Sequence, residues 1–125
     1  MQTLVAIAIG GAAGALSRHF VASAVSKWAD SGFPYGTMSV NVLGSLLMGL
    51  LITVFAHKFE AAPELRALLT VGFLGSFTTF STYSLETVLL VERGDIQGAA
   101  LYAFGSLAIG VLALLAGMWL GRLLT

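Results

Sequence analysis

The chain has 125 residues, of which 58% are hydrophobic and only 10% are charged, and its mean hydropathy is +0.94. Because about a quarter of the residues in a soluble domain are charged, this composition predicts a membrane protein. The formal net charge of zero indicates no nucleic-acid partner, and the lack of cysteine excludes disulfides, thiol catalysis and thiolate metal sites.

The first apolar span is predicted over residues 3–26. Gly10 and Gly14 in it form a Gly-x-x-x-Gly pair, which allows a neighbouring helix to approach closely. Arg18 lies well inside the same span. It either attracts an anion toward a vestibule or snorkels to the membrane surface as a structural residue, and the sequence leaves both interpretations open.

The second span is predicted over residues 36–56, and it carries one polar stripe. Thr37, Asn41 and Ser45 follow one another at steps of four residues, so they share one face of a helix that is otherwise apolar. An amide in hydrocarbon is costly unless it is hydrogen-bonded. We therefore expect Asn41 to line a functional site or to bond to another helix.

The third span is predicted over residues 64–92, with a break near its middle. Seven of the nine residues from Ser76 to Ser84 carry a hydroxyl, and Gly72 and Gly75 precede them. A polar, glycine-interrupted segment at membrane depth is tolerated only where protein covers it or where it lines a cavity. A break over residues 75–79 would leave backbone carbonyls without helical partners.

The fourth span is predicted over residues 96–120. It carries a second stripe of small and polar residues at Tyr102, Ser106 and Gly110. Glu86, near the end of the preceding span, is the only carboxylate well inside an apolar stretch. We expect this carboxylate to be a structural hydrogen-bond partner rather than a proton carrier.

Residues 1–125 are predicted to form a single all-α domain of four transmembrane helices. Orientation normally follows an excess of lysine and arginine on the cytoplasmic side. Here three such residues lie near each side, namely Lys58, Arg66 and Arg122 near one and Arg18, Lys27 and Arg93 near the other. This balance predicts a chain that inserts both ways round and pairs as an antiparallel, dual-topology homodimer.

The polar groups inside the spans favour a small anion as the conducted solute. A cation pathway would need rings of carboxylates, and a proton-coupled pump would need a chain of acidic or histidine residues. The spans instead offer an amide, hydroxyls and the positive edges of aromatic rings, which replace an anion's hydration without holding it too tightly. A lone hydroxyl usually bonds to the backbone of its own helix, so the interpretation as an anion route depends on how many hydroxyls lie together. Carbonyls freed by two breaks that meet at a dimer axis would also suit a hard monovalent cation.

Three motifs resemble the CrcB/Fluc family of fluoride channels. They are GGAAGALSR at residues 10–18, GTMSVNVLGS at 36–45 and GFLGSFTTFSTY at 72–83, and the third is the most specific. The resemblance extends over nearly the whole chain. It implies a dual-topology homodimer in the bacterial plasma membrane that conducts fluoride through two pores, with a structural sodium ion buried at the dimer centre.

The resemblance also implies roles for individual residues. The fluoride pore is expected to contain Thr37, Asn41, Phe80, Tyr83, Tyr102 and Ser106. Arg18 matches the arginine of the first helix, and polar support is expected from Glu86, Thr79 and Ser81. The backbone carbonyls of Gly75 and Thr78 match those that hold the sodium ion. Tyr83 departs from the family's usual phenylalanine, and its hydroxyl adds a donor and an acceptor on the fluoride route.

The expected function is passive and selective conduction of fluoride, with export of the toxic ion as the physiological role. One alternative is a small dual-topology multidrug or cation exporter, but this would need a carboxylate in its first span, and residues 2–17 contain none. Another is a membrane assembly subunit that transports nothing. The sequence displays no set of nucleophile, base and acid, so the chain is not expected to be an enzyme.

Overall fold

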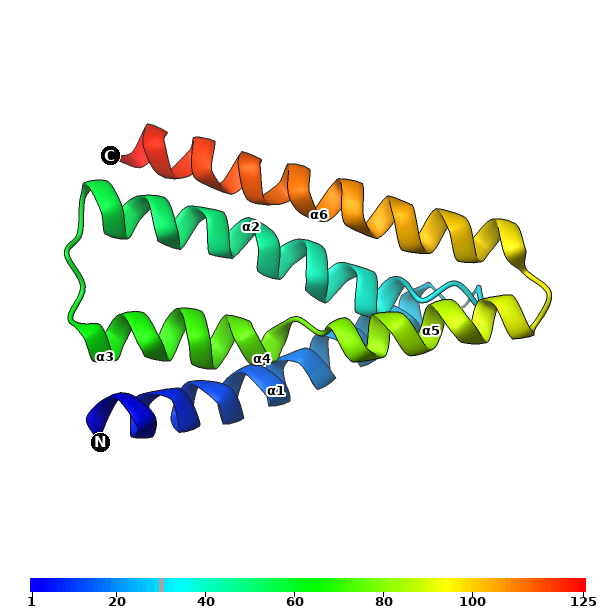
Figure 1. Cartoon of the computed structure of the whole chain (residues 1–125), viewed down its shortest axis with the longest axis horizontal. Helices are drawn as coiled ribbons and strands as arrows, with labels where there is room; N and C mark the ends of the chain where they lie inside the picture. Colours follow the sequence, from blue (N-terminus) through cyan, green and yellow to red (C-terminus); the bar gives the residue numbers. More distant parts are fainter. Residues whose placement is uncertain (30) are drawn as a thin grey trace.

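The computed structural model describes residues 1–29 and 31–125, and within them it contains helices and no β-strand (Figure 1). Both termini lie at the same end of the molecule as the connection from α2 to α3, so the chain runs back and forth between two ends. The predicted all-α architecture is confirmed. In chain order the helices are α1 (Gln2–Trp28), α2 (Tyr35–His57), α3 (Pro63–Arg66), the π-helix η1 (Ala67–Leu74), α4 (Gly75–Phe77), α5 (Phe80–Glu92) and α6 (Ile96–Leu124).

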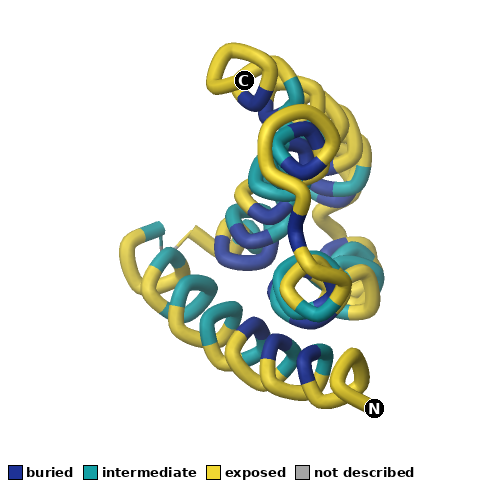
Figure 2. Tube along the Cα trace, turned by 90° about the vertical axis from the view of Figure 1, so that its left-hand side faces the viewer, coloured by how far each residue is buried: buried dark blue, intermediate teal, exposed yellow. Residues whose placement is uncertain are grey.

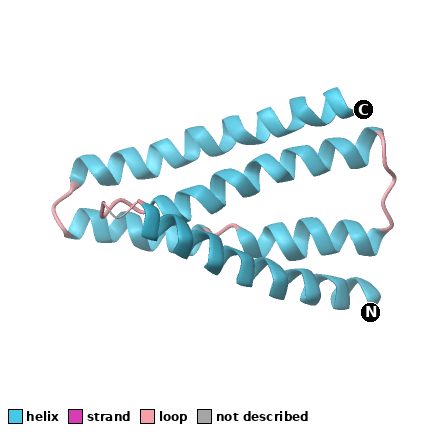
Figure 3. Ribbon diagram, turned by 180° about the vertical axis from the view of Figure 1, so that it is seen from behind, coloured by secondary structure: helices cyan, strands magenta, loops and turns pink. Residues whose placement is uncertain are grey.

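Three of these helices, α1, α2 and α6, are each long and apolar enough to cross a membrane. Their bounds differ from the predicted spans by only a few residues at each end. The remaining predicted span is a composite, since α3, η1, α4 and α5 follow one another along a single column. Figure 3 shows this column from behind, with the short loop that interrupts it.

The outer surface of the molecule is apolar, as lipid contact requires. Figure 2 shows that buried positions lie where helices face one another, while exposed positions cover the outside. Large apolar side chains such as Leu4, Phe104 and Leu107 are each more than half exposed. Lipid tails replace water around such side chains, so their exposure carries no penalty in a bilayer.

Glycines bring α1 and η1 into direct backbone contact. A Cβ on Gly10 would collide with the carbonyl oxygen of Leu68, and a Cβ on Gly14 would collide with the carbonyl oxygen of Phe73. The prediction that this pair admits a neighbouring helix closely is therefore confirmed. A Cβ on Gly72 would lie only 2.8 Å from the carbonyl oxygen of Ile7, so this glycine serves the same contact.

The pairing of α2 with α6 follows the same rule. A Cβ on Gly49 would collide with the carbonyl oxygen of Leu114, and one on Gly117 would collide with that of Leu46. Small residues let helix backbones approach closely in a membrane, where packing replaces the hydrophobic effect as the main attraction. The fold therefore contains two tightly packed groups, α1 with η1 and α2 with α6.

The predicted break in the third span is present, and it lies at the end of the predicted range of residues 75–79. Gly75 is helical, with φ −61° and ψ −32°. The chain leaves the helix at Thr78 (φ −91°, ψ 160°) and Thr79 (φ −152°, ψ 124°) and becomes helical again at Phe80. The break therefore lies within its predicted range but is shorter, since Gly75 keeps helical backbone angles and the chain opens where Thr79 makes a tertiary contact, described below.

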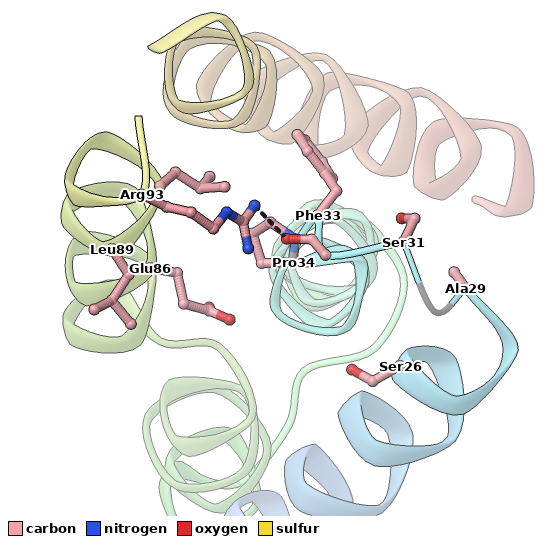
Figure 4. Close-up of a pocket in the computed structure, with 10 residues that line it drawn as sticks. Ser26, Ala29, Ser31, Phe33, Pro34, Glu86, Leu89 and Arg93 are labelled. Carbon is pink, nitrogen blue, oxygen red and sulfur yellow. Dashed lines mark hydrogen bonds between the residues drawn. The ribbon is translucent and has the colours of Figure 1, made fainter. Parts of the chain in front are cut away.

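Two turns meet at the end of the molecule opposite the termini. Gly32 and Gly94 have φ values of +79° and +87°, which only glycine adopts without strain. The guanidinium of Arg93 donates to the carbonyl oxygen of Gly32 at 3.0 Å, so it ties the two turns together. Figure 4 shows Arg93 reaching across this end of the molecule, with Glu86 on the same helix. Asp95 caps α6 by accepting from the N–H of Gly98 at 2.8 Å.

Candidate functional site

The side chain of Asn41 forms a clamp on the break. Its Oδ1 accepts from the backbone N–H of Thr79 at 2.7 Å, and its Nδ2 donates to the carbonyl oxygen of the same residue at 3.1 Å. One amide thus satisfies both polar backbone groups of a residue that lies outside any helix. A backbone group left unpaired at membrane depth is costly, so the expectation that Asn41 bonds to another helix segment has a clear physical basis.

This clamp diverts the hydrogen bonds that would continue the helix. In an unbroken helix the N–H of Thr79 would bond to the carbonyl of Gly75, and the N–H of Thr82 would bond to that of Thr78. The first N–H bonds to Asn41 instead, and the second donates to Oγ1 of Thr79 at 3.3 Å, which caps α5. The carbonyls of Gly75 and Thr78, which the resemblance assigns to sodium, are therefore among those that lose the donor a continuous helix would give them.

A groove of about 530 Å³ runs beside the break, and residues of α2, α5 and α6 line it. Four of the expected pore residues lie on it, and they come from three different helices. None of the described residues that line it carries a charge. The lining consists of Asn41, Ser45, Thr78, Thr79, Phe80, Tyr83, Ser106, Leu107 and Gly110.

Ser106 has the most distinctive environment in this groove. It is only 8% exposed, and its Oγ is the one buried side-chain polar atom without a hydrogen-bond partner among the described residues. A buried hydroxyl normally bonds to protein or to water, so an unpaired one that faces a groove is available to a solute. Ser45, which lines the same groove, was placed on the polar stripe of α2 but not among the pore residues; its position one turn from Asn41 was the available signal.

Thr37 and Arg18 lie apart from this groove. They line a separate cavity of about 190 Å³ where α1 diverges from α5, together with Thr82. Thr79 borders both cavities, so the break separates them. The polar stripe predicted for α2 is therefore divided in the structure, with Thr37 on one side of the break and Asn41 on the other.

Tyr102 and the partly exposed Glu86 form a hydrogen-bonded pair behind the groove. Tyr102 is fully buried and lines neither cavity, and its hydroxyl donates to Oε1 of Glu86 at 3.3 Å. This is the hydrogen-bonding role expected of Glu86, which also borders a third cavity of about 290 Å³ at the end of the molecule shown in Figure 4. Ser81 is exposed on α5 and lines none of these cavities.

The described residues contain no group of three or more histidine, cysteine or acidic side chains that could hold a metal ion. Carbonyl oxygens are the remaining candidates, and unwound carbonyls in broken membrane helices are suitable ligands for sodium. Gly75 is exposed and Thr78 is partly exposed in a single chain, so neither carbonyl is sealed inside the helix bundle.

Comparison with known proteins gives a consistent result over almost the whole chain. The model of the family described as CrcB-like protein, camphor resistance, matches residues 5–118. A protein of Rhodospirillum centenum named fluoride-specific ion channel FluC is 47% identical over 122 residues, which are 98% of this chain and 97% of that protein. Proteins with the same name from Phenylobacterium zucineum and Chelativorans sp. are 48% and 45% identical and also cover 97% or more of both chains.

The family match and the geometry agree. The three motifs, the broken third span and the clamp on its break all lie within the matched residues. Helices long and apolar enough to span a membrane lie both before and after the break. The chain therefore belongs to the CrcB family and is a multi-pass membrane protein.

Proposed function

We propose that the protein is a fluoride-selective channel that conducts the ion passively along the groove beside the break. The observation that carries the proposal is the unpaired, buried hydroxyl of Ser106 in a groove whose described lining has no charge. A neutral donor replaces part of the anion's hydration but releases it again, as conduction requires. The relatives named fluoride-specific ion channels support the choice of ion, and the chain is a transporter rather than an enzyme.

The conducting unit is an antiparallel homodimer of two oppositely inserted chains. The exposure of polar groups at mid-span supports this proposal, because lipid is a poor neighbour for them. The hydroxyl residue Ser81, next to Phe80, and Gly75, whose carbonyl loses its helical donor, are exposed in the single chain. A second copy would cover these residues and close the open side of the groove, so that each dimer contains two pores. The equal division of lysine and arginine between the two sides supports insertion in both orientations.

A sodium ion would bind at the centre of this dimer. The carbonyls of Gly75 and Thr78, whose helical donors are diverted, supply two oxygen atoms in each chain. A two-fold axis at the break would bring together four such oxygens, which suits a hard monovalent cation. The ion would supply no chemistry to conduction; it would hold the two breaks together.

The physiological role that fits these properties is fluoride export across the bacterial plasma membrane. Arg18 lines the smaller cavity on the other side of the break, where its charge attracts an anion toward the protein. Thr37 in that cavity, and Asn41 and Ser106 in the groove, then replace water around the ion. Phe80 and Tyr83 offer ring edges along the same path.

Fluoride efflux from reconstituted liposomes tests the proposal. We expect vesicles loaded with fluoride to empty through the protein, and vesicles loaded with chloride to retain their contents. Failure to release fluoride would refute the channel function. The multidrug or cation exporter and the assembly subunit that transports nothing would then remain as the alternatives. Because the chain has no cysteine, a single cysteine introduced at Thr125 reports orientation. Labelling from both sides of intact vesicles is expected, whereas labelling from one side only would refute dual topology.

A further inference from the structure

The hydroxyl of Tyr83 is bound to the neighbouring helix rather than directed to a solute. It lies on α5 and donates to the backbone carbonyl of Ala103 on α6, with an oxygen-to-oxygen distance of 2.6 Å. A phenol carries a single O–H proton. Once that proton is donated to a carbonyl, the oxygen has only lone pairs left, and lone pairs repel an anion.

The ring of Tyr83 contacts two other aromatic rings. Its centroid lies 5.7 Å from that of Phe80 and 5.3 Å from that of Tyr102, in tilted arrangements of 38° and 42°. Tyr102 is itself held by its hydrogen bond to Glu86. Contacts with two neighbouring rings and a hydrogen bond at the tip leave the ring little freedom, so its position beside the groove is well defined.

Three of the hydroxyls along the groove show two kinds of environment. Those of Thr78 and Tyr83 donate their protons to backbone carbonyls, the first to Leu74 at 3.0 Å. The hydroxyl of Ser106 is buried and unpaired, so its proton remains available. This difference separates groups that shape the groove from a group that can bind the ion.

We propose that the hydroxyl of Tyr83 is an anchor that ties α5 to α6, and that Tyr83 meets the conducted anion with its ring and not with its hydroxyl. The inference rests on the proposed function, since it concerns the same groove. The hydroxyl of Tyr83 thus positions the residue and does not bind the ion. This anchoring also explains how a phenol is compatible with a route for a strongly hydrogen-bonding anion, because its proton is already committed.

Ultraviolet resonance Raman spectroscopy tests the anchor without measuring flux. The intensity ratio of the tyrosine Fermi doublet distinguishes a phenol that donates its proton from one that does not. The chain has three tyrosines, so the spectrum of the wild type minus that of Tyr83→Phe isolates the signal of interest. We expect the donor signature in sodium chloride and the same signature in sodium fluoride at equal concentration. A missing donor signature, or a signature that changes with fluoride, would overturn the proposal.

Flux through two variants at the same position tests the role of the ring. Tyr83→Phe keeps the ring but removes the hydrogen bond at its tip, so fluoride efflux should fall only about threefold. A fall of this size is expected when one side chain regains its rotational freedom. Tyr83→Leu removes the ring as well, and efflux should be nearly abolished. If Tyr83→Phe were as inactive as Tyr83→Leu while both proteins elute as the wild type does, the hydroxyl would be the ligand and the inference would be wrong.

The two measurements separate this inference from the proposed function. If the wild-type protein releases no fluoride, the channel function is refuted, and so is the contact between the Tyr83 ring and the anion. The Raman signature in sodium chloride would still show whether the Tyr83 hydroxyl donates its proton to α6. If Tyr83→Phe does not fold, the double variant Tyr35→Phe/Tyr102→Phe leaves Tyr83 as the only tyrosine. Its spectrum then shows directly whether the phenol donates.

Discussion

The third span has two halves with opposite surroundings. Before the break, η1 and α4 pack on α1 through glycine contacts that bring backbone against backbone. After the break the chain no longer packs on α1, and α5 packs on α6, with hydroxyls and aromatic rings beside the groove. A straight helix presents each face to one neighbour along its whole length, so an interruption lets one span serve two neighbours. The first half supplies tight packing, and the second half supplies chemistry.

If this division is correct, the largest effect on conduction should come from the second half. Phe80→Ile removes a ring that lines the groove and replaces it with an apolar side chain that has no positive edge. We expect fluoride efflux from liposomes to be nearly abolished while the protein still elutes as the wild-type assembly. Efflux at the wild-type rate would remove the rings from the mechanism.

The next largest effect should come from the clamp that joins the two halves. Asn41→Ala leaves the N–H and the carbonyl of Thr79 without partners, at a cost of about 1–3 kcal/mol for each group. We expect a clearly lower Tm in detergent and at least a tenfold loss of efflux, about 1.4 kcal/mol in the barrier.

Ser45→Ala is the matched control for the clamp. It removes a polar group from the same helix and the same groove, but none of the hydrogen bonds found between α2 and the break. Its Tm should stay close to that of the wild type. An equal loss of Tm in both variants would show that Asn41 does not hold the break.

A smaller and purely functional effect is expected at Ser106. Ser106→Ala removes a hydroxyl that has no protein partner, so stability should be unchanged or slightly higher. Loss of one hydrogen bond to the ion is worth about 1 kcal/mol, so efflux should fall by about fivefold to tenfold. A drop in Tm together with unchanged efflux would contradict the role given to this hydroxyl.

The smallest effect on conduction is expected in the first half. Gly14→Ala places a Cβ against the carbonyl of Phe73, and overpacking of this kind costs about 1–3 kcal/mol. The Tm should fall, while ion selectivity among the folded channels should stay the same. Gly105→Ala is the control, because the nearest atom to its Cβ is 4.0 Å away, at the flexible end of Met38. A changed selectivity in Gly14→Ala would mean that the two halves do not divide packing from chemistry.

The positions of the helices were readable from the sequence because they depend on local properties. Long apolar segments must be helical in lipid, since each helix satisfies its own backbone hydrogen bonds. Turns and charged residues then limit each span, which is why the predicted bounds of α1, α2 and α6 are close to those observed. The glycine pair at Gly10 and Gly14 was also readable, because its spacing alone places both residues on one face.

The details of the site depended on contacts between residues far apart in the chain. The glycines and hydroxyls placed the break within residues 75–79. Its narrower position at Thr78 and Thr79 coincides with a contact that the sequence does not show, in which Asn41, 38 residues away, binds the backbone of Thr79. The same contact divides Thr37 from Asn41, although a helical repeat of four places them on one stripe.

The sequence by itself determined that this protein has apolar spans and a polar interruption with the motifs of one family. Only the tertiary structure decided which residues of the interruption leave the helix, which carbonyls lose their donors and which hydroxyls keep a free proton. The reason is physical: a hydrogen-bonding group in a membrane must find a partner, and its identity depends on which helices pack together. For Tyr83 that partner is the Ala103 carbonyl on the next helix, which no spacing in the sequence could have revealed.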